Sequence, residues 1–349
     1  MRFTARGRAL AATAAVVLLA ILGFVLFAGG GKGPRLIAQA FGGGHASPPP
    51  PATCPLTGTP APGGVVPHRP ALAIKVENLP QARPQTGLNF ADVVYEEPVE
   101  AGITRFIAIF QCREAPRVEP VRSGRMEDPV VLVQYDHPLF GYAGAVPEVM
   151  AAVKRAGIHD VNFNVEPSAY LRDPARIAPH NLYTSTAALW AYAPKGQGAP
   201  PPVFTFQKTP PAGGQPAASI HLPFSVYSDV TWRYAPKKDV WFRYYNGTVP
   251  ANLSNGSVIS ARNVVVMVVR VTLSAITDVN GVHSPYAHLI GSGPAYVLRN
   301  GRVYKGRWVR PSMGSITKYV DAQGNVIPLA PGTTWVELLP STVPVTLSK

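Results

Sequence analysis

The abundance of glycine and proline constrains the fold of this chain more than any other feature of its sequence. Of the 349 residues, 32 are glycine and 38 are proline, so about a fifth of the chain disfavours helix interiors. This composition excludes a long helical bundle or a coiled coil and predicts short strands joined by loops. The hydrophobic share of 46% and the charged share of 15% exclude a disordered polyelectrolyte.

The N-terminus combines a basic start with a long apolar run. Arg2, Arg6 and Arg8 precede residues 9–28, which carry no charge and would form about 30 Å of helix, enough to cross a bilayer core. We therefore expect residues 1–8 to be a cytoplasmic n-region. Residues 9–28 are expected to be a single-pass transmembrane signal anchor in the cell membrane, with the bulk of the chain extracytoplasmic.

A cleaved signal peptide is the alternative interpretation of this segment. Ala38, Gln39 and Ala40 form a small-residue cleavage motif. The apolar run is longer than the roughly 7–15 residues that are usual for such signals, and this length favours the uncleaved anchor. Both interpretations place the rest of the chain outside the cytoplasm.

The extracytoplasmic location favours a disulfide between the two cysteines, because exported proteins commonly form disulfides. Cys54 and Cys112 are the only cysteines, and a bridge between them would close a loop of about 59 residues, worth roughly 4 kcal/mol of unfolded-state entropy. Two unpaired thiols are the alternative. Cys54 lies too far beyond the apolar run to carry a lipid anchor. Since no Cys/His cluster of the metal-binding kind is present, we expect no metal site and no cofactor.

Composition divides the exported part into two domains. Residues 29–70 are rich in Gly, Pro and Ala and are expected to be a linker. A second stretch of this composition, residues 194–218, is expected to separate an N-terminal domain of residues 71–193 from a C-terminal domain of residues 219–345.

Hydrophobic periodicity predicts an α+β protein. The N-terminal extracytoplasmic domain is expected to be mixed α/β, with a helix over Val146–Ala156 that ends at Gly157. The C-terminal domain is expected to be mainly antiparallel β, with hairpin turns at Asn246-Gly247, Asn300-Gly301 and Gln323-Gly324-Asn325. The expected strands are residues 71–76, 92–95, 104–110, 224–234, 240–245, 263–273, 295–298, 302–309 and 334–339.

Polar residues gather in short loops beside the strands of the first domain, where scaffolds usually carry function. Arginines in these loops present forked donors suited to a phosphate or a carboxylate, provided that they converge. The alternative is that arginines and acids only form structural ion pairs. The candidate ligand-binding residues are Arg83, Arg105, Arg122, Arg125, Glu77, Asn78, Glu96, Glu100, Asn181 and Tyr183.

Three residues are candidates for catalysis. His180 is the best candidate for proton transfer, because its ordinary pKa lies near neutrality, although a lone histidine is more often structural. Asp92 could hold a divalent cation beside a phosphate. Ser123 lies between two arginines and is a conceivable nucleophile, but it lacks the G-x-S-x-G turn of hydrolases.

A series of short segments, in a fixed order, carries a resemblance to a known family. The segments are Cys54–Gly58, Arg69–Asn78, Ala82–Leu88, Ala91–Glu97, Gly102–Phe106, Pro120–Arg125, Ala178–Tyr183, Val230–Tyr234, Ala261–Val266, Gly291–Ala295, Gly306–Trp308 and Pro331–Val336. Together they resemble the bacterial YerB-like lipoprotein family over about residues 54–340. The resemblance implies a two-part extracytoplasmic protein of uncharacterised function, and it supplies no catalytic residue. The chain lacks the lipobox of a lipoprotein.

Two functions are consistent with these features. One is a cell-envelope binding protein that engages an anionic envelope polymer or a protein partner, helped by residues 191–349, which carry 15 basic and five acidic side chains. Nucleic acid is not an expected partner because the chain is exported. The alternative is an envelope enzyme that acts on a phosphate-linked glycan, a phosphotransferase or hydrolase with Mg²⁺, by analogy of layout with LytR-CpsA-Psr phosphotransferases.

Four tryptophans allow a further choice between sugar stacking and core packing. They lie inside strand-like runs, and this position favours core packing. The four are Trp232, Trp241, Trp308 and Trp335.

Overall fold

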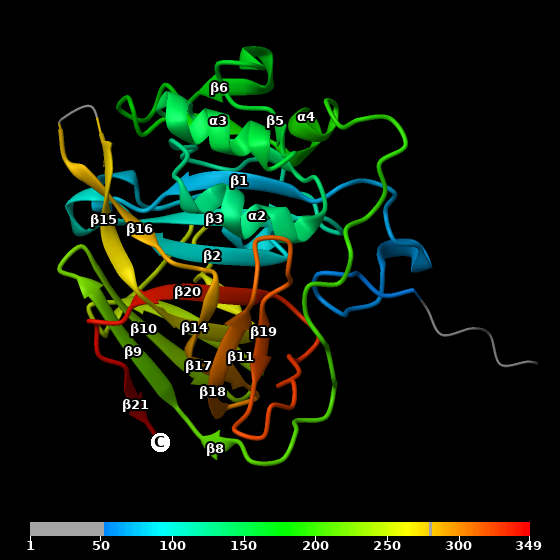
Figure 1. The fold of residues 1–349 in the computed structure, drawn as a ribbon, viewed down its shortest axis with the longest axis vertical. Helices are drawn as coiled ribbons and strands as arrows, with labels where there is room; N and C mark the ends of the chain where they lie inside the picture. The colour runs from blue at the N-terminus through cyan, green and yellow to red at the C-terminus, as the bar shows by residue number, and fades with distance from the viewer. Residues whose placement is uncertain (1–51, 279–280) are drawn as a thin grey trace, which may run out of the picture. The chain divides into compact units, whose positions relative to one another are not determined.

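The computed structural model describes residues 52–278 and 281–349 (Figure 1). The expected n-region and anchor, and most of the first expected linker, lie outside the described residues. Residues 50–349 form one compact unit. Within the described residues, no helix is both long and apolar enough to cross a membrane.

Short elements dominate both halves of the described chain, as the glycine and proline content predicts. The helices are α2 (Glu127–Leu132), α3 (Pro147–Arg155) and α4 (Thr186–Trp190). The strands of the first half are β1 (Leu72–Glu77), β2 (Val93–Pro98), β3 (Thr104–Phe110), β4 (Leu139–Gly141), β5 (His159–Asp160), β6 (Tyr170–Arg172) and β7 (Leu182–Thr184). Those of the second half are β8 (Gln215–Pro216), β9 (Ser219–Ser225), β10 (Ser228–Ala235), β11 (Val240–Tyr245), β12 (Val249–Pro250), β13 (Ser260–Ala261), β14 (Asn263–Val269), β15 (Val271–Thr277), β16 (His283–Ala287), β17 (Gly291–Arg299), β18 (Arg302–Arg310), β19 (Lys318–Val320), β20 (Thr334–Pro340) and β21 (Thr346–Ser348).

One large sheet runs through both halves of the chain. Its strand order is β19-β18-β17-β14-β20-β2-β3-β1-β4-β5, with β8 attached to β18. The junction is β20, which pairs in parallel with β14 on one side and with β2 on the other. Residues 71–193 and 219–345, expected as separate domains, therefore contribute strands to the same sheet, and Figure 1 shows β20 between β2 and β14.

A smaller sheet, in the order β12-β11-β10-β9-β21 with β13 beside β11, covers one face of the large sheet. Its inward residues and those of β2, β3 and β20 form one buried cluster, in which Trp232 and Trp335 lie edge to face with ring centroids 5.2 Å apart. Trp241 and Trp308 are buried as well. The preference for core packing over sugar stacking is thus confirmed for all four tryptophans.

Helices α2 and α3 cover the opposite face of the large sheet, as Figure 1 shows. The second buried cluster lies there and includes Val131 of α2, Val153 of α3 and Ile107 of β3. The predicted helix is confirmed as α3, and it ends at Gly157, whose φ of 68° is the left-handed conformation that favours glycine. The α+β class expected from periodicity is confirmed.

Two of the predicted strands are each divided in the structure. The prediction over residues 224–234 spans the end of β9, a turn at Val226 and Tyr227, and most of β10. Val226 and Tyr227 are not residues that turns prefer, and the signal left is the weaker one of Ser225, whose Oγ accepts a hydrogen bond from the Tyr227 amide at 3.0 Å. The prediction over residues 263–273 breaks at Arg270, where the chain leaves the large sheet and starts a separate hairpin of β15 and β16.

The expected disulfide is confirmed. Cys54 and Cys112 are bonded, with a Cα–Cα distance of 6.0 Å. Their buried contacts with Ala61 join the segment before β1 to the end of β3. The bond therefore fixes the entry of the chain onto the large sheet.

Candidate functional site

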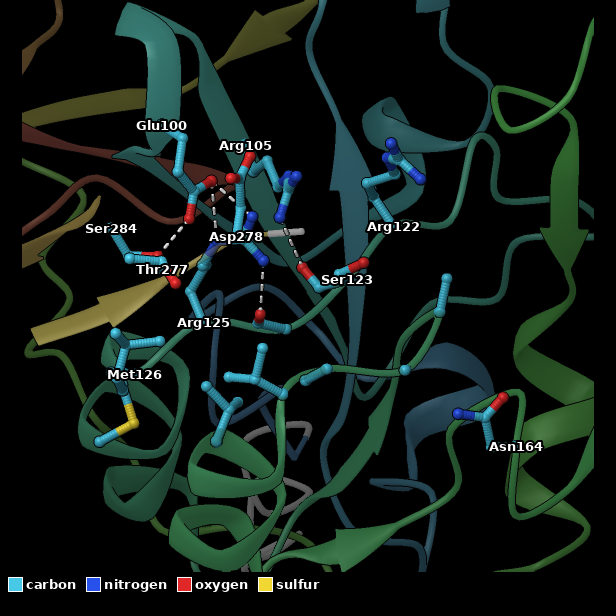
Figure 2. A pocket seen from close by; sticks show the side chains of 17 residues that line it. Glu100, Arg105, Arg122, Ser123, Arg125, Met126, Asn164, Thr277, Asp278 and Ser284 are labelled. Carbon is cyan, nitrogen blue, oxygen red and sulfur yellow. Dashed lines mark hydrogen bonds and ion pairs between the residues drawn. The ribbon is translucent and has the colours of Figure 1, made fainter. Parts of the chain in front are cut away.

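A cavity of about 430 Å³ lies at the end of β3 that begins with Thr104 and Arg105. Its walls come from both halves of the chain: the Arg122–Met126 loop, residues 143–146, the start of α3, and the β15–β16 hairpin. Figure 2 shows the cavity, with Arg105, Arg122 and Arg125 around one end of it. Arg122 and Arg125 are three residues apart on one loop, whereas Arg105 reaches the cavity from β3.

 Three of the four arginines of the predicted ligand site therefore share one cavity.

Arg105 reaches this cavity because of the alternation of side chains along β3. Ile107 and Ile109 point to the helix-covered face of the sheet, and Arg105 shares that face because strand side chains alternate with a period of two. In register, Arg105 lies between Glu77 of β1 and Glu97 of β2. Both glutamates form ion pairs with other cations, Glu97 with Lys75 and Glu77 with Arg122.

The Arg105 side chain is buried and incompletely paired. Only 5% of the residue is exposed, and its Nη1 donates to the Ser123 carbonyl oxygen at 3.0 Å. Its buried Nε has no hydrogen-bond partner among the described residues, although the charges of Glu100 and Glu77 partly offset the effect of burial on its pKa. Burial, followed by the positive charge of Arg125, lowers the pKa of Arg105 to about 9.

The other two arginines of the cavity are each held by a glutamate. Arg122 Nε donates to Glu77 Oε1 at 3.1 Å, and Arg125 Nε donates to Glu100 Oε2 at 3.1 Å. Burial raises the pKa of Glu100, but the hydrogen bond and charge of Arg125 outweigh burial and hold this pKa below its ordinary value. The two ion pairs fix the positions of guanidinium groups that remain partly exposed in the cavity wall.

Glu77 also binds the candidate proton-transfer residue. His180 Nδ1 lies 2.8 Å from Glu77 Oε2, so a single buried carboxylate bridges His180 and Arg122. His180 lines a different cavity, of about 550 Å³, together with Arg83 and Arg176. The arginine cavity and the histidine cavity are thus separate sites that share Glu77.

Several candidate residues lie away from the arginine cavity and have structural contacts. Asp92 is buried, and its carboxylate accepts hydrogen bonds from the backbone amides of Gln111 and Cys112 and from Arg113. Burial raises the pKa of Asp92 in spite of these partners. Arg83 stacks 3.7 Å above the Tyr245 ring and donates to Asn78 Oδ1 at 3.1 Å.

The remaining candidates also serve contacts within the fold. Glu96 is fully buried and forms an ion pair with Arg243 at 2.6 Å on the face opposite the arginine cavity. Asn181 accepts a hydrogen bond from Arg172 at 2.8 Å. Tyr183 lies under the guanidinium of Arg117, with 3.9 Å from the Arg117 Cζ to the ring centroid.

The cavity contains residues that the sequence did not indicate. Ile276, Thr277 and Ser284 come from the β15–β16 hairpin, and Ser284 Oγ donates a hydrogen bond to Glu100 Oε1. No local signal marks the hairpin as part of a site formed mainly by residues 100–149, because the contact depends on the joining of both halves. Within the described ranges 52–278 and 281–349, no cluster of three His, Cys, Asp or Glu residues could hold a metal ion.

A second polar cluster lies beside the cavity, under α2. Lys75 Nζ donates to Glu97 and, at 2.6 Å, to Asp128 Oδ1, and all three side chains are fully buried. Burial raises the pKa of Glu97 to about 7, against the charge of Lys75. Asp128 Oδ2 also accepts a hydrogen bond from the Arg125 backbone amide at 2.6 Å. The cluster therefore fixes the loop that carries Arg122 and Arg125.

Comparison with known proteins assigns the chain to a family without a known function. Residues 56–199 match the N-terminal domain of a family described as "Protein of unknown function (DUF3048)", and residues 220–336 match its C-terminal domain. The interval between the two matches, residues 200–219, overlaps the expected linker over residues 194–218.

Two further comparisons agree with this assignment. The chain is 28% identical over 305 residues to a protein of Bacillus subtilis (strain 168) named "Putative lipoprotein YerB", covering 84% of this chain and 88% of that protein. A crystal structure of the YerB protein from Bacillus subtilis matches with a TM-score of 0.71 and 25% identity, covering 84% of this chain and 99% of that chain. The chain belongs to the two-part, YerB-like DUF3048 family, as the order of its sequence motifs implied.

Proposed function

We propose that this protein is a membrane-anchored, extracytoplasmic binding protein of the cell envelope, and that it holds an anionic ligand in the cavity of Arg105, Arg122 and Arg125. The observation that carries the proposal is the Arg105 guanidinium, which is 5% exposed, lines the cavity and has a buried Nε without a hydrogen-bond partner among the described residues. A buried cation whose donors are incompletely paired is costly. An anion in the cavity would supply the missing partner through charge-assisted hydrogen bonds.

The charge of the second half supports this assignment. Residues 191–349 carry 15 basic and five acidic side chains, which favours encounters with anionic material at low ionic strength. An anionic envelope polymer or an acidic protein segment fits this charge. Nucleic acid is not proposed, because the proposed location removes the usual encounter.

The proposed location rests on the N-terminal sequence and on a relative. Residues 9–28 carry no charge and follow three arginines, a pattern typical of a single-pass anchor with the following chain outside. The similar protein of Bacillus subtilis is named as a lipoprotein, which is also a membrane-tethered class. The present chain would use an apolar helix where a lipoprotein uses a lipid.

Binding is favoured over catalysis by the distribution of the candidate catalytic groups. Asp92 is occupied by backbone amides and Arg113, and His180 lines the other cavity. Ser123 does line the arginine cavity, but the only histidine among the candidates is not beside it. The alternative function, an enzyme acting on a phosphate-linked glycan with Mg²⁺, predicts product release from a polyprenyl-pyrophosphate substrate.

The test is calorimetric titration of residues 50–349 with inorganic phosphate and pyrophosphate. This piece forms a compact unit, and nearly the whole crystallised YerB chain corresponds to 84% of the present one, so it is expected to fold alone. The Arg105→Gln variant should bind at least about tenfold more weakly, because a charge-assisted hydrogen bond is lost.

The matched control is Arg155→Gln, which removes an exposed arginine of α3 outside the cavity. It should bind the anions as the unmodified chain does. Absence of anion binding by the unmodified chain, or equal losses in the two variants, would contradict the proposed site. Turnover of the pyrophosphate substrate that depends on Arg122 would favour the enzyme instead.

A further inference from the structure

The arginine cavity has a second wall of a different chemistry. Besides its charged groups, the cavity is lined by the apolar side chains of Met126, Ala145, Val146 and Val149, and by Ile276 of the β15–β16 hairpin. Met126, Val146 and Ile276 are half-buried, so part of each apolar side chain remains accessible. Figure 2 shows Met126 on the far side of Arg125 from Arg105.

The volume of the cavity exceeds the needs of an inorganic oxyanion. At about 430 Å³ it falls within the range of about 300–1,000 Å³ that is typical of sites for organic ligands. Such sites combine an apolar lining with a few polar groups that fix the orientation of the ligand. A cationic end and an apolar wall in one cavity suit a ligand with the same two parts.

The number of guanidinium groups bears on the chemistry of the anionic part. Three arginines and two carboxylates, those of Glu100 and Asp278, border the cavity. Glu77 and Glu100 hold Arg122 and Arg125 in position. A phosphate monoester presents three terminal oxygens and about −1.5 to −2 charges at pH 7. A carboxylate presents two oxygens and one charge, and it leaves more of the donors unused.

We infer that the ligand of this cavity is a phosphate monoester whose ester group is apolar. The phosphoryl group lies among Arg105, Arg122 and Arg125, and the apolar group contacts Val146, Val149 and Ile276. This inference rests on the proposed function and specifies its ligand class. The phosphate monoester can be free in solution or be the exposed headgroup of a lipid, since the shared chemistry is the same.

The test compares short alkyl phosphates of increasing length by calorimetric titration against residues 50–349. Each buried methylene should strengthen binding by up to about fourfold, so hexyl phosphate should bind at least about tenfold more tightly than methyl phosphate. Glycerol phosphate, which is polar along its length, should bind no more tightly than methyl phosphate. Hexanoate should bind more weakly than hexyl phosphate.

Two substitutions on one strand test whether the gain in affinity with alkyl length arises in the cavity. Ile276→Thr retains a β-branched side chain but makes the apolar wall polar, and it should abolish most of the gain from methyl to hexyl phosphate. Leu273→Thr changes a 73% exposed residue of the same strand, β15, outside the cavity, and it should retain the gain. Methyl phosphate should bind equally to both variants.

The outcomes separate this inference from the proposed function. Binding of phosphate with no gain from alkyl length, or an equal effect of the two variants, would overturn the apolar ester and leave anion binding intact. Tighter binding of hexanoate than of hexyl phosphate would overturn the phosphoryl assignment. Failure of every anion to bind would overturn both proposals.

Vesicles distinguish the two sources of such an ester. Residues 50–349 should sediment with phosphatidylcholine vesicles that contain phosphatidic acid if the cavity takes a lipid headgroup with its first carbons. Binding of hexyl phosphate without vesicle binding would assign a free ester. Either result supports the inference, provided that the alkyl-length effect is lost in Ile276→Thr.

Discussion

At the scale of single residues, two neighbouring glutamates show how the pleat of a strand sets the environment of a side chain. Glu96 and Glu97 of β2 point to opposite faces of the sheet. Glu96 pairs with Arg243 between the two sheets, whereas Glu97 pairs with Lys75 under α2. Both are fully buried, and neither could be distinguished from a surface acid by its residue type.

Glu97 gives a test of its buried environment through the pH dependence of stability. Its pKa is raised by burial from 4.5 to about 7, so between these values the folded chain retains a proton that the unfolded chain releases. The contribution of Glu97 to the free energy of unfolding therefore falls as pH rises through this window. The difference in free energy of unfolding between Glu97→Gln and the unmodified chain should shift by roughly 1–3 kcal/mol in favour of the variant from pH 5 to pH 8.

Urea unfolding of residues 50–349 at the two pH values measures this gain. Glu148→Gln is the control, because Glu148 is an exposed residue in the first turn of α3. Its stability relative to the unmodified chain should not change with pH. A constant difference for Glu97→Gln would show that Glu97 is ionised over the whole range in the folded chain.

Arg105 gives a second pH test, in ligand binding. Burial and the charge of Arg125 lower the pKa of its guanidinium to about 9, so Arg105 loses its proton within an accessible range. Phosphate esters are fully dianionic there, since their second pKa is about 6. Anion affinity, measured by calorimetry, should therefore fall between pH 8 and pH 10. An affinity that is independent of pH over this range would contradict the assigned role of Arg105.

At the scale of elements, β20 is the strand on which the architecture depends. It joins β2 of the first half to β14 of the second half through parallel pairing. Its Glu337 and Glu96 of β2 both form ion pairs with Arg243 of β11, and all three side chains are fully buried. Burial and the charge of Glu96 raise the pKa of Glu337 well above its ordinary value.

This ion-pair network should be sensitive to the loss of its single cation. Arg243→Met would leave Glu96 and Glu337 buried without a positive partner, and we expect a loss of about 3–5 kcal/mol in the free energy of unfolding at neutral pH. The loss should be smaller at pH 5, where the carboxyl groups accept protons more readily. Chemical denaturation at both pH values measures it.

Arg233→Met is the matched control for this prediction. Arg233 is an exposed residue on the neighbouring strand β10, and its replacement should change stability by no more than about 0.5 kcal/mol. Equal effects of the two substitutions would show that the buried network contributes nothing specific to stability.

At the scale of the whole molecule, the two halves share a sheet and a core. Two contacts join the halves: β2 pairs in parallel with β20, and Phe106 packs against Trp335 with ring centroids 5.2 Å apart. The arginine cavity also depends on both halves, because Ile276 and Ser284 of the second half line it. The sequence boundary over residues 194–218 thus separates two segments that are structurally interdependent.

We therefore expect that neither half folds stably alone. Residues 52–199 would expose the edge of β2, and residues 219–349 would expose the edge of β20 that pairs with β2 and the Trp335 side chain. Each piece should lack a cooperative thermal transition by circular dichroism, whereas residues 50–349 should show one. A cooperative transition in either separate piece would contradict this interdependence.

Much of the local structure could be predicted from the sequence. The run over Thr104–Phe110, the helix that ends at Gly157 and the turn at Asn300-Gly301 are confirmed, because each depends on neighbouring residues: strand propensity, a left-handed cap and a two-residue hairpin. The turn at Val226 and Tyr227 was missed, since its residues are not those that turns prefer.

The sequence by itself determined the α+β class and the polar segments that supply Arg105, Arg122 and Arg125, and it favoured the pairing of Cys54 with Cys112 that the structure confirms. Only the tertiary structure decided that these three arginines share a cavity, while Arg83 and His180 line another. The reason is that propensity and capping act over a few residues. Convergence of side chains is decided by strand order, by the face on which each side chain emerges, and by a hairpin contributed from the other half of the chain.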